Sequence, residues 1–348
     1  MIEIRSLKVA GKVTLKHIAD ELGVSAMTVS RALNNSGSVQ GKTQERILET
    51  ARQMGYRPNH IAKSLVSRRT YTLGVVIPEI SHSFFPEVIR GIEEVVYDKG
   101  YQIILAHSSE DAVREQEVVE MLLSKRVDGI MISCSQNTED ASFFENIAKT
   151  DTRIVFFDRC IEDIGISCIG VNDRNAAYKI TEHLINLGKR RIAHLKGSGK
   201  VSITKNRLLG FEEALHQNRV NTFSELIIES GFQEKGGYEA MKVLLDLPTH
   251  KRPDAVFAVN DPVAFGAMDA INEAGLRIPE DMALVGFSDD IRSPLMSVPL
   301  TTIHQPAYDM GTKAASKLIR LIENDKELQE KVMLISTLKV RESCGANQ

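Results

Sequence analysis

Charged and amide side chains follow several short apolar runs of the sequence, at points where a strand would end. Asp158 and Arg159 follow one such run, Asn260 and Asp261 follow another, and Asp289 follows a third. Carboxylate, guanidinium and amide groups gathered in this way suit a ligand that is rich in hydroxyl groups. Any single one of these residues could instead serve a structural ion pair.

Two adjacent aromatic residues, Phe84 and Phe85, follow the apolar run 73–78 and the polar residues 81–83. A paired aromatic in such a loop can form a stacking wall for a sugar or a base. We expect one of the two rings to belong to the core.

No residue pattern selects a chemical reaction. Neither paired carboxylates nor a spacing of nucleophile and base stands out. The run GSGKVS at 197–202 resembles a phosphate-binding loop, but His194 stands where the full pattern needs Gly and Val201 where it needs Ser or Thr. We therefore expect no nucleotide site, no cofactor and no enzymatic activity.

The four cysteines are scattered, without a C-x-x-C pair or a matching histidine spacing, so we expect reduced thiols and no metal site. No apolar run approaches the length of about 20 residues that a membrane helix needs. The N-terminal residues 1–13 also lack the apolar stretch of a secretory signal. We expect a cytoplasmic protein without a membrane partner.

Apolar runs alternate with helical patterns from residue 73 onward, and this alternation predicts the elements that position the residues above. The predicted strands are 73–78, 101–107, 129–133, 153–157, 191–195, 225–229, 255–259 and 282–287. The predicted helices are 86–99, 111–125, 139–149, 174–187, 203–217, 233–245 and 262–274. Continuous apolar strands followed by helices indicate parallel sheets covered on both faces. Apolar runs of this kind are too numerous for one compact sheet, so they favour two doubly wound lobes.

The charge of the 348 residues is divided unevenly. The formal net charge is −3, but residues 1–70 hold 12 Lys and Arg against 5 Asp and Glu, a net charge of +7, and residues 71–348 carry −10. A small basic head on a large acidic body indicates that only the head binds nucleic acid.

The basic head contains the pattern of two short helices around a glycine. Thr14 opens the first, whose apolar stripe ends before Gly23, and Ser25 is the expected N-cap of the second. The outer face of the second helix is predicted to carry Met27, Thr28, Ser30, Arg31 and Asn34. Small polar residues and an arginine suit a helix-turn-helix that reads the major groove. The alternative is a plain helix pair with a solvated face.

Several motifs in the same order resemble the lactose/galactose repressor family of bacterial transcription regulators. They are TLKHIADELGVSAMTVSRALN, YRPNHIAKSL, LGVVIP, IGV, GFEEAL, VGFSDD and LTTIHQP. The resemblance implies an all-α helix-turn-helix head at 12–57, a hinge helix and linker at 58–70, and a body at 71–342. The body would be like the periplasmic sugar-binding proteins, with lobes at about 72–170 plus 303–330 and 171–302 plus 331–342.

The resemblance also implies which residues meet DNA. The base contacts fall on Ala26, Met27 and Arg31, and the backbone-facing positions on Thr14, Thr28, Ser30 and Asn34. Leu65 matches the hinge leucine that wedges into the minor groove, the alternative being that it packs the hinge against the core. His17 replaces the usual Asp, so we expect the Thr14 cap to lose its acidic partner and His17 to be available to a DNA phosphate.

In the body, Arg207 matches the ligand-gripping arginine of the family and joins the candidates Phe84, Phe85, Asp158, Arg159, Asn260, Asp261 and Asp289. Ser288 stands where several members carry an effector-binding Asp, which weakens the assignment of Asp289. Val201 replaces the second arginine of the purine type, and this favours a sugar or a sugar phosphate.

These observations together predict a homodimeric repressor that binds a palindromic double-stranded operator under the control of a small effector. The C-terminal residues RESCGANQ lack the leucine heptads of a tetramer, so we expect a dimer. The alternative function is a sugar-binding module that does not bind DNA. A phosphorylated carrier protein as co-effector, and the choice between induction and corepression, are left open.

Overall fold

The computed structural model describes residues 13–34, 39–56, 69–199 and 201–346. The chain divides into two compact units, Met1–Thr70 and Tyr71–Gln348, called here the head and the body. The expected hinge helix, with Leu65, lies outside the described residues.

The described part of the head consists of three helices, α1 (Leu15–Leu22), α2 (Ala26–Leu33) and α3 (Gly41–Gln53). Ile18, Val29 and Ile47, one from each helix, are fully buried together. Gly23 closes α1 with a φ of +64°, and the Ser25 side chain caps α2 by accepting from the Thr28 N–H. The predicted helix pair is confirmed, with α3 completing its core.

The body contains two six-stranded sheets. Sheet one has the order β11-β5-β4-β3-β1-β2, and sheet two has the order β12-β10-β9-β8-β6-β7. Sheet one comprises β1 (Thr72–Ile77), β2 (Gln102–His107), β3 (Gly129–Ile132), β4 (Arg153–Phe157), β5 (Ser167–Val171) and β11 (Lys331–Leu334). Sheet two comprises β6 (Ile192–Lys196), β7 (Ile227–Glu229), β8 (Ala255–Ala258), β9 (Ala283–Ser288), β10 (Thr301–His304) and β12 (Thr337–Lys339). All pairings are parallel except that of β10 with β12.

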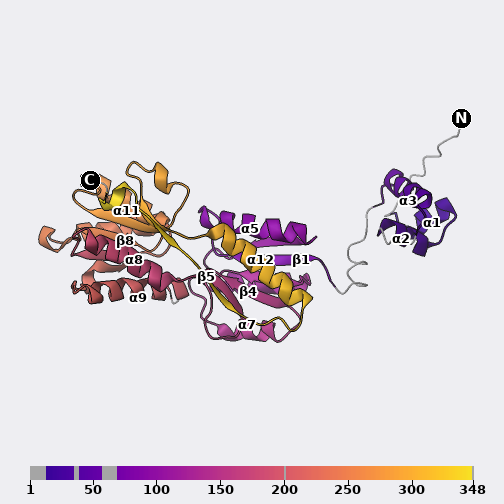
Figure 1. Cartoon of the computed structure of the whole chain (residues 1–348), viewed down its shortest axis with the longest axis horizontal. Coiled ribbons are helices and arrows are strands. Elements are labelled where there is room, and N and C mark those ends of the chain that lie inside the picture. Colours follow the sequence, from indigo (N-terminus) through magenta and orange to yellow (C-terminus); the bar gives the residue numbers. More distant parts are fainter. Residues whose placement is uncertain (1–12, 35–38, 57–68, 200, 347–348) are drawn as a thin grey trace. The chain divides into compact units, whose positions relative to one another are not determined.

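Helices cover both faces of each sheet, which explains the continuous apolar strands. The helices of lobe one are α5 (Phe84–Asp98), α6 (Ala112–Ser124), α7 (Ala141–Ala148) and α12 (Ala307–Glu323). Those of lobe two are α8 (Asp173–Asn186), α9 (Ser202–Gln217), α10 (Glu234–Leu245) and α11 (Asp261–Glu273). In β1, Val75 belongs to the core under α5 and α12, whereas Val76 belongs to the core under α6 and α7 (Figure 1). The predicted fold class, a helical head and two parallel-sheet lobes, is confirmed.

The C-terminal crossings between the lobes differ from the expected ones. Residues 303–304 belong to β10 of lobe two, where Ile303 pairs with Phe287, and residues 331–334 belong to β11 of lobe one, where Lys331 pairs with Cys168. The chain was expected to return to lobe one at about 303 and to lobe two at about 331. Each return comes later than expected, by the length of one short strand. Backbone pairing along β5, which would otherwise end at an open edge, holds β11 in sheet one.

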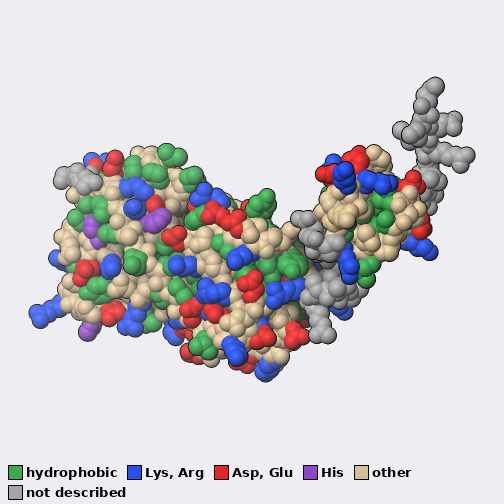
Figure 2. All heavy atoms as spheres, turned by 45° about the vertical axis from the view of Figure 1, so that its right-hand side comes forward, with side chains coloured by type: hydrophobic (Ala, Val, Ile, Leu, Met, Phe, Trp, Pro, Cys, Tyr) green, Lys and Arg blue, Asp and Glu red, His purple; other side chains and the backbone are tan. Residues whose placement is uncertain are grey.

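Acidic and basic side chains intermingle over the face of the body that Figure 2 shows. Within the described ranges, no helix combines the length and the apolar character needed to cross a membrane.

Candidate ligand cleft and DNA-binding helix

The exposed face of α2 carries the predicted DNA-reading residues. Ala26, Met27 and Arg31 are exposed, and Met27 has 63% of its surface accessible. Met27 and Arg31 are four residues apart, so their side chains lie on the same face of the helix.

The remaining predicted DNA contacts lie around the helix ends. The Thr28 hydroxyl is 2.9 Å from the Ser25 hydroxyl, and the Asn34 amide donates to the Ser30 carbonyl at 2.9 Å. These polar groups are thus held in place at both ends of α2.

His17 takes the place of an acidic residue in the N-terminal cap of α1. Thr14 accepts a hydrogen bond from the His17 N–H at 3.4 Å, and the His17 Nδ1 accepts from the Thr14 N–H at 3.3 Å. The capping box of α1 is therefore present with histidine in the place of the acidic residue. The cap has lost its acidic partner, as expected, but the imidazole nitrogen of His17 accepts the same hydrogen bond in its place.

A cleft with a cavity volume of about 50 Å³ lies between the lobes of the body and is lined by residues of both. Its lining includes six predicted residues: Phe84, Phe85, Asp158, Arg159, Arg207 and Asn260. Phe85 is only 5% exposed and packs edge-on against Phe157, so one ring of the aromatic pair does belong to the core.

Arg159 is the most informative residue of the cleft. It is 4% exposed, its Nη1 donates to both carboxylate oxygens of Glu110 at 2.8 Å, and it stacks over the Phe232 ring at 4.3 Å. Its Nε is buried without a hydrogen-bond partner, and so is Nδ1 of His82. Buried polar atoms without hydrogen-bond partners are costly, so a ligand atom is the natural partner of each.

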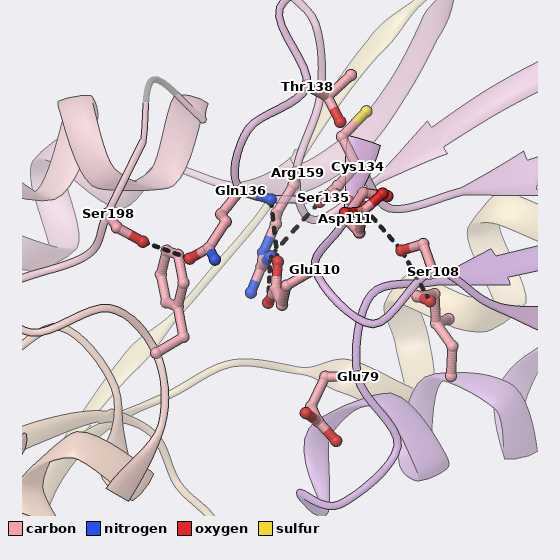
Figure 3. A network of polar contacts seen from close by, with 12 residues as sticks. Glu79, Ser108, Glu110, Asp111, Cys134, Ser135, Gln136, Thr138, Arg159 and Ser198 are labelled. Atoms are coloured by element: carbon pink, nitrogen blue, oxygen red, sulfur yellow. Dashed lines mark hydrogen bonds and ion pairs between the residues drawn. The ribbon is translucent and has the colours of Figure 1, made fainter. Parts of the chain in front are cut away.

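The loop that follows β3 supports the Arg159–Glu110 pair (Figure 3). The Gln136 N–H donates to Glu110 at 2.9 Å, and the preceding Ser135 N–H donates to the fully buried Glu115 at 2.5 Å. Burial raises the pKa of Glu115, against the hydrogen bonds that it accepts from Thr138 and Ser135. The Gln136 side chain also contacts the hydroxyl of Ser198 in lobe two.

Arg207 is buried in an ion pair under the cleft. Its Nε donates to Asp173 at 2.8 Å, its Nη1 donates to the carbonyl of Val259, and its guanidinium lies over the Phe287 ring at 3.6 Å. Burial raises the pKa of Asp173 to about 6, although the positive charge of Arg207 acts in the opposite direction. Arg207 is thus presented to the cleft in a fixed orientation.

Two predicted residues do not line the cleft. Asp261 is fully buried and accepts from the Asp290 N–H and from the hydroxyls of Ser293 and Thr302. Asp289 pairs with Arg341 at 2.6 Å, and its other oxygen lies 3.1 Å from Nδ1 of His304. Both carboxylates are therefore held by hydrogen bonds and ion pairs within the body, and neither lines this cleft.

The cleft contains residues that the sequence reasoning did not single out. They are Glu79, Glu110, Ile203, Phe232, Gln233, Pro262 and Gln305. Glu110, Gln233 and Gln305 follow β2, β7 and β10, so the strand-end rule applied to every strand would have indicated them.

Polar contacts cross the cleft between the lobes. His82 Nε2 is 3.0 Å from the Gln233 side-chain oxygen, and the Gln233 amide donates to Glu79 at 2.8 Å. Burial opposes ionisation of Glu79, but hydrogen bonds from Ser81, Gln233 and Ile80 together lower its pKa to about 2. These contacts depend on how the lobes are placed, so a ligand between them can favour one placement.

The cysteines differ from the expectation. Cys160 and Cys168 form a disulfide, whereas Cys134 and Cys344 are free and buried. The prediction of four reduced thiols is wrong for this pair, because the turn between β4 and β5 returns Cys168 to the side of Cys160. Among the described residues, no cluster of three or more His, Cys, Asp or Glu is placed to hold a metal ion.

Comparison with known proteins identifies the family. Residues 14–59 match the model "Bacterial regulatory proteins, lacI family", and residues 181–344 match the periplasmic binding protein-like domain. The HTH-type transcriptional regulator RegA of Clostridium saccharobutylicum is 34% identical over 321 residues, which cover 91% of this chain and 94% of RegA. The chain belongs to the lacI family of bacterial regulatory proteins.

Solved structures of lacI-family regulators agree with this assignment. A lac repressor dimer bound to operator and an anti-inducer has a TM-score of 0.86 at 26% identity, with 96% of this chain and 99% of that chain covered. A complex of the regulator CelR with cellobiose has a TM-score of 0.73 at 27% identity, with 95% and 100% covered. The chain is therefore a transcriptional repressor of this family, with a DNA-binding head and an effector-binding body.

Proposed function

We propose that this lacI-family chain binds a palindromic operator as a homodimer through Ala26, Met27 and Arg31 of α2, with Thr14, Thr28, Ser30 and Asn34 near the DNA backbone. Exposure of Met27 and Arg31 on one helix face supports this assignment. Leu65 is proposed as the minor-groove wedge on the family resemblance alone. DNA as partner implies action in the cytoplasm.

The effector is proposed to bind in the cleft at Phe84, Phe85, Asp158, Arg159, Arg207 and Asn260. The observation that carries this proposal is the buried Nε of the cleft residue Arg159, which has no hydrogen-bond partner and lies 3.8 Å from the Asp158 carboxylate. The Asn260 side chain is committed to capping α11 and to the Phe232 carbonyl, so its contribution is the placement of that ring.

The charges of the cleft favour a neutral sugar over a sugar phosphate. Four carboxylates line it, those of Glu79, Glu110, Asp158 and Asp290, against the guanidinium groups of Arg159 and Arg207. Glu110 and Asp173 already pair with those two arginines. A phosphate dianion would meet excess negative charge, whereas sugar hydroxyls can donate to the carboxylates.

A thermal-shift screen of the full chain tests this proposal, with ribose, glucose and cellobiose beside ribose 5-phosphate and glucose 6-phosphate. A ligand that binds the folded state raises the melting temperature. We expect a neutral sugar to raise it more than its phosphate, and Arg159→Lys, which loses the Nε donor, to reduce that shift. Lys235→Ala, on an exposed helix face, is the control that leaves the shift unchanged. A larger shift with a phosphate than with its parent sugar contradicts the assignment.

A further inference from the structure

The disulfide between Cys160 and Cys168 stands next to the ligand cleft. Cys160 directly follows Asp158 and Arg159, which line the cleft, and Cys168 lies in β5. The two Cα atoms are 6.0 Å apart, a separation that a disulfide requires. The residues 158–166 between β4 and β5 form neither helix nor strand. The cross-link therefore closes residues 160–168 into a ring, and the cleft residues Asp158 and Arg159 directly precede it.

Backbone contacts around the cross-link reach the cleft residues. The Asp158 N–H donates to the Ile169 carbonyl at 2.9 Å, and Asp158 has a φ of +58°. The Cys160 N–H donates to the Ser202 hydroxyl at the start of α9 in lobe two, at 3.3 Å. A left-handed conformation at a non-glycine residue persists only where its surroundings fix it, and the cross-link lies two residues away.

The disulfide also lines a surface groove of about 230 Å³. Arg174 and Lys331 share the lining of this groove with the two cysteines. Carboxylates of Asp158, Glu162 and Asp173 also line the groove, and each of the two cysteines is 7% exposed, so a small thiol or disulfide reagent can reach the cross-link from the groove. The free cysteines are more deeply buried. Burial raises the pKa of the Cys134 thiol. Burial opposes ionisation of Cys344, but hydrogen bonds with His183 and Thr301 lower its pKa, and its exposed fraction is only 1%.

We propose that Cys160 and Cys168 form a reversible redox modification site that fixes the Asp158–Arg159 segment when oxidised. The thiolate of one cysteine attacks a small-molecule disulfide of the glutathione class, which forms a mixed disulfide and releases one small thiol. The second thiolate then displaces the other small thiol and forms the Cys160–Cys168 bond. Two protons and two electrons leave the cysteines, and the reagent disulfide is reduced to two thiols. The consequence for effector binding rests on the function proposed above.

Thiol trapping on the full chain tests the redox half of this inference. The protein is equilibrated in glutathione buffers from fully reduced to fully oxidised, quenched with acid, alkylated and analysed by intact mass and peptide mapping. We expect alkylated cysteines to fall from four to two across the series, with Cys134 and Cys344 labelled throughout. Four labelled cysteines in every buffer, or a bond that no buffer reduces, overturns the proposal.

Amide hydrogen exchange tests the second part of the proposal, that the disulfide fixes the Asp158–Arg159 segment. Exchange in residues 158–166 should be faster in the reduced wild type than in the oxidised one, because reduction opens the loop. Cys160→Ser/Cys168→Ser should exchange alike in both buffers, and Cys134→Ser should keep the wild-type difference. Equal exchange in the two states of the wild type overturns this half. Neither experiment uses DNA or an effector, so the outcome is independent of whether the proposed function holds.

Discussion

Replacing Arg207 by alanine is expected to destabilise the body by about 3–5 kcal/mol, because the change leaves a buried carboxylate without its partner. Arg207 is 2% exposed and its Nε is 2.8 Å from an oxygen of Asp173, which is 7% exposed. The change also removes the hydrogen bond to the Val259 carbonyl and the contact with the Phe287 ring.

A second ion pair between the same two helices provides a matched control. Arg174 of α8 and Glu213 of α9 are also 2.8 Å apart, but their side chains are 55% and 33% exposed. Exposed pairs contribute roughly 0–1 kcal/mol, so Arg174→Ala should cost less than about 1 kcal/mol. Because the two ion pairs have the same N–O distance and differ in exposure, the difference between the two losses of stability measures the effect of burial.

Urea unfolding of the full chain without effector, followed by circular dichroism at pH 8 and pH 5, measures both costs. Burial raises the pKa of Asp173 to about 6, so at pH 5 this carboxyl is largely protonated and the cost of Arg207→Ala should shrink. Arg207→Ala costing no more than Arg174→Ala at pH 8, or the same at both pH values, would refute the reasoning.

Other predictions concern the fold. Burial raises the pKa of Asp261 to about 6, so the stability of the wild type relative to Asp261→Asn should fall by about 2 kcal/mol between pH 4 and pH 8 in urea titrations, and parallel profiles would contradict this. Gly311→Ala puts a Cβ 2.0 Å from the Val88 carbonyl oxygen in the α5–α12 contact and should cost about 3 kcal/mol of stability in thermal melts. Gly41→Ala has open space around it and should be neutral or stabilising. Equal effects of the two variants would argue against the close contact at Gly311. Thr14→Ala removes the α1 cap and should cost the head about 1 kcal/mol, seen as faster amide exchange in residues 15–22; unchanged exchange would show the cap to be unimportant.

The alternation of strands and helices could be predicted because burial on both faces leaves a strong pattern. Val75 and Val76 are adjacent, point to opposite faces of β1 and are both fully buried. The strand β11 has no such pattern, since its residues are alternately exposed and half-buried. Its place in sheet one comes from backbone pairing with β5, and backbone groups are the same in every sequence.

The cleft could be predicted in part, for a related reason. A residue's position after a strand indicates which loops come together, and on this basis Asp158 and Arg159 were correctly expected to line the cleft. It does not indicate direction: Asp261 is the first residue of α11 and is buried under Asp290, which lines the cleft itself. Spacing likewise did not reveal the Cys160–Cys168 pair, which depends on the path of the loop.

Selection of the full chain on a randomised duplex library, in the presence and absence of the sugar that the thermal-shift screen identifies, tests the central claim most directly. The account predicts enrichment of two inverted half-sites about one helical turn apart, with the degree of enrichment changed by the sugar. Arg31→Ala should relax base preference at one symmetric pair of positions, a loss of about 1–3 kcal/mol in discrimination. Absence of any enriched sequence, or enrichment that neither the sugar nor Arg31→Ala alters, would contradict it.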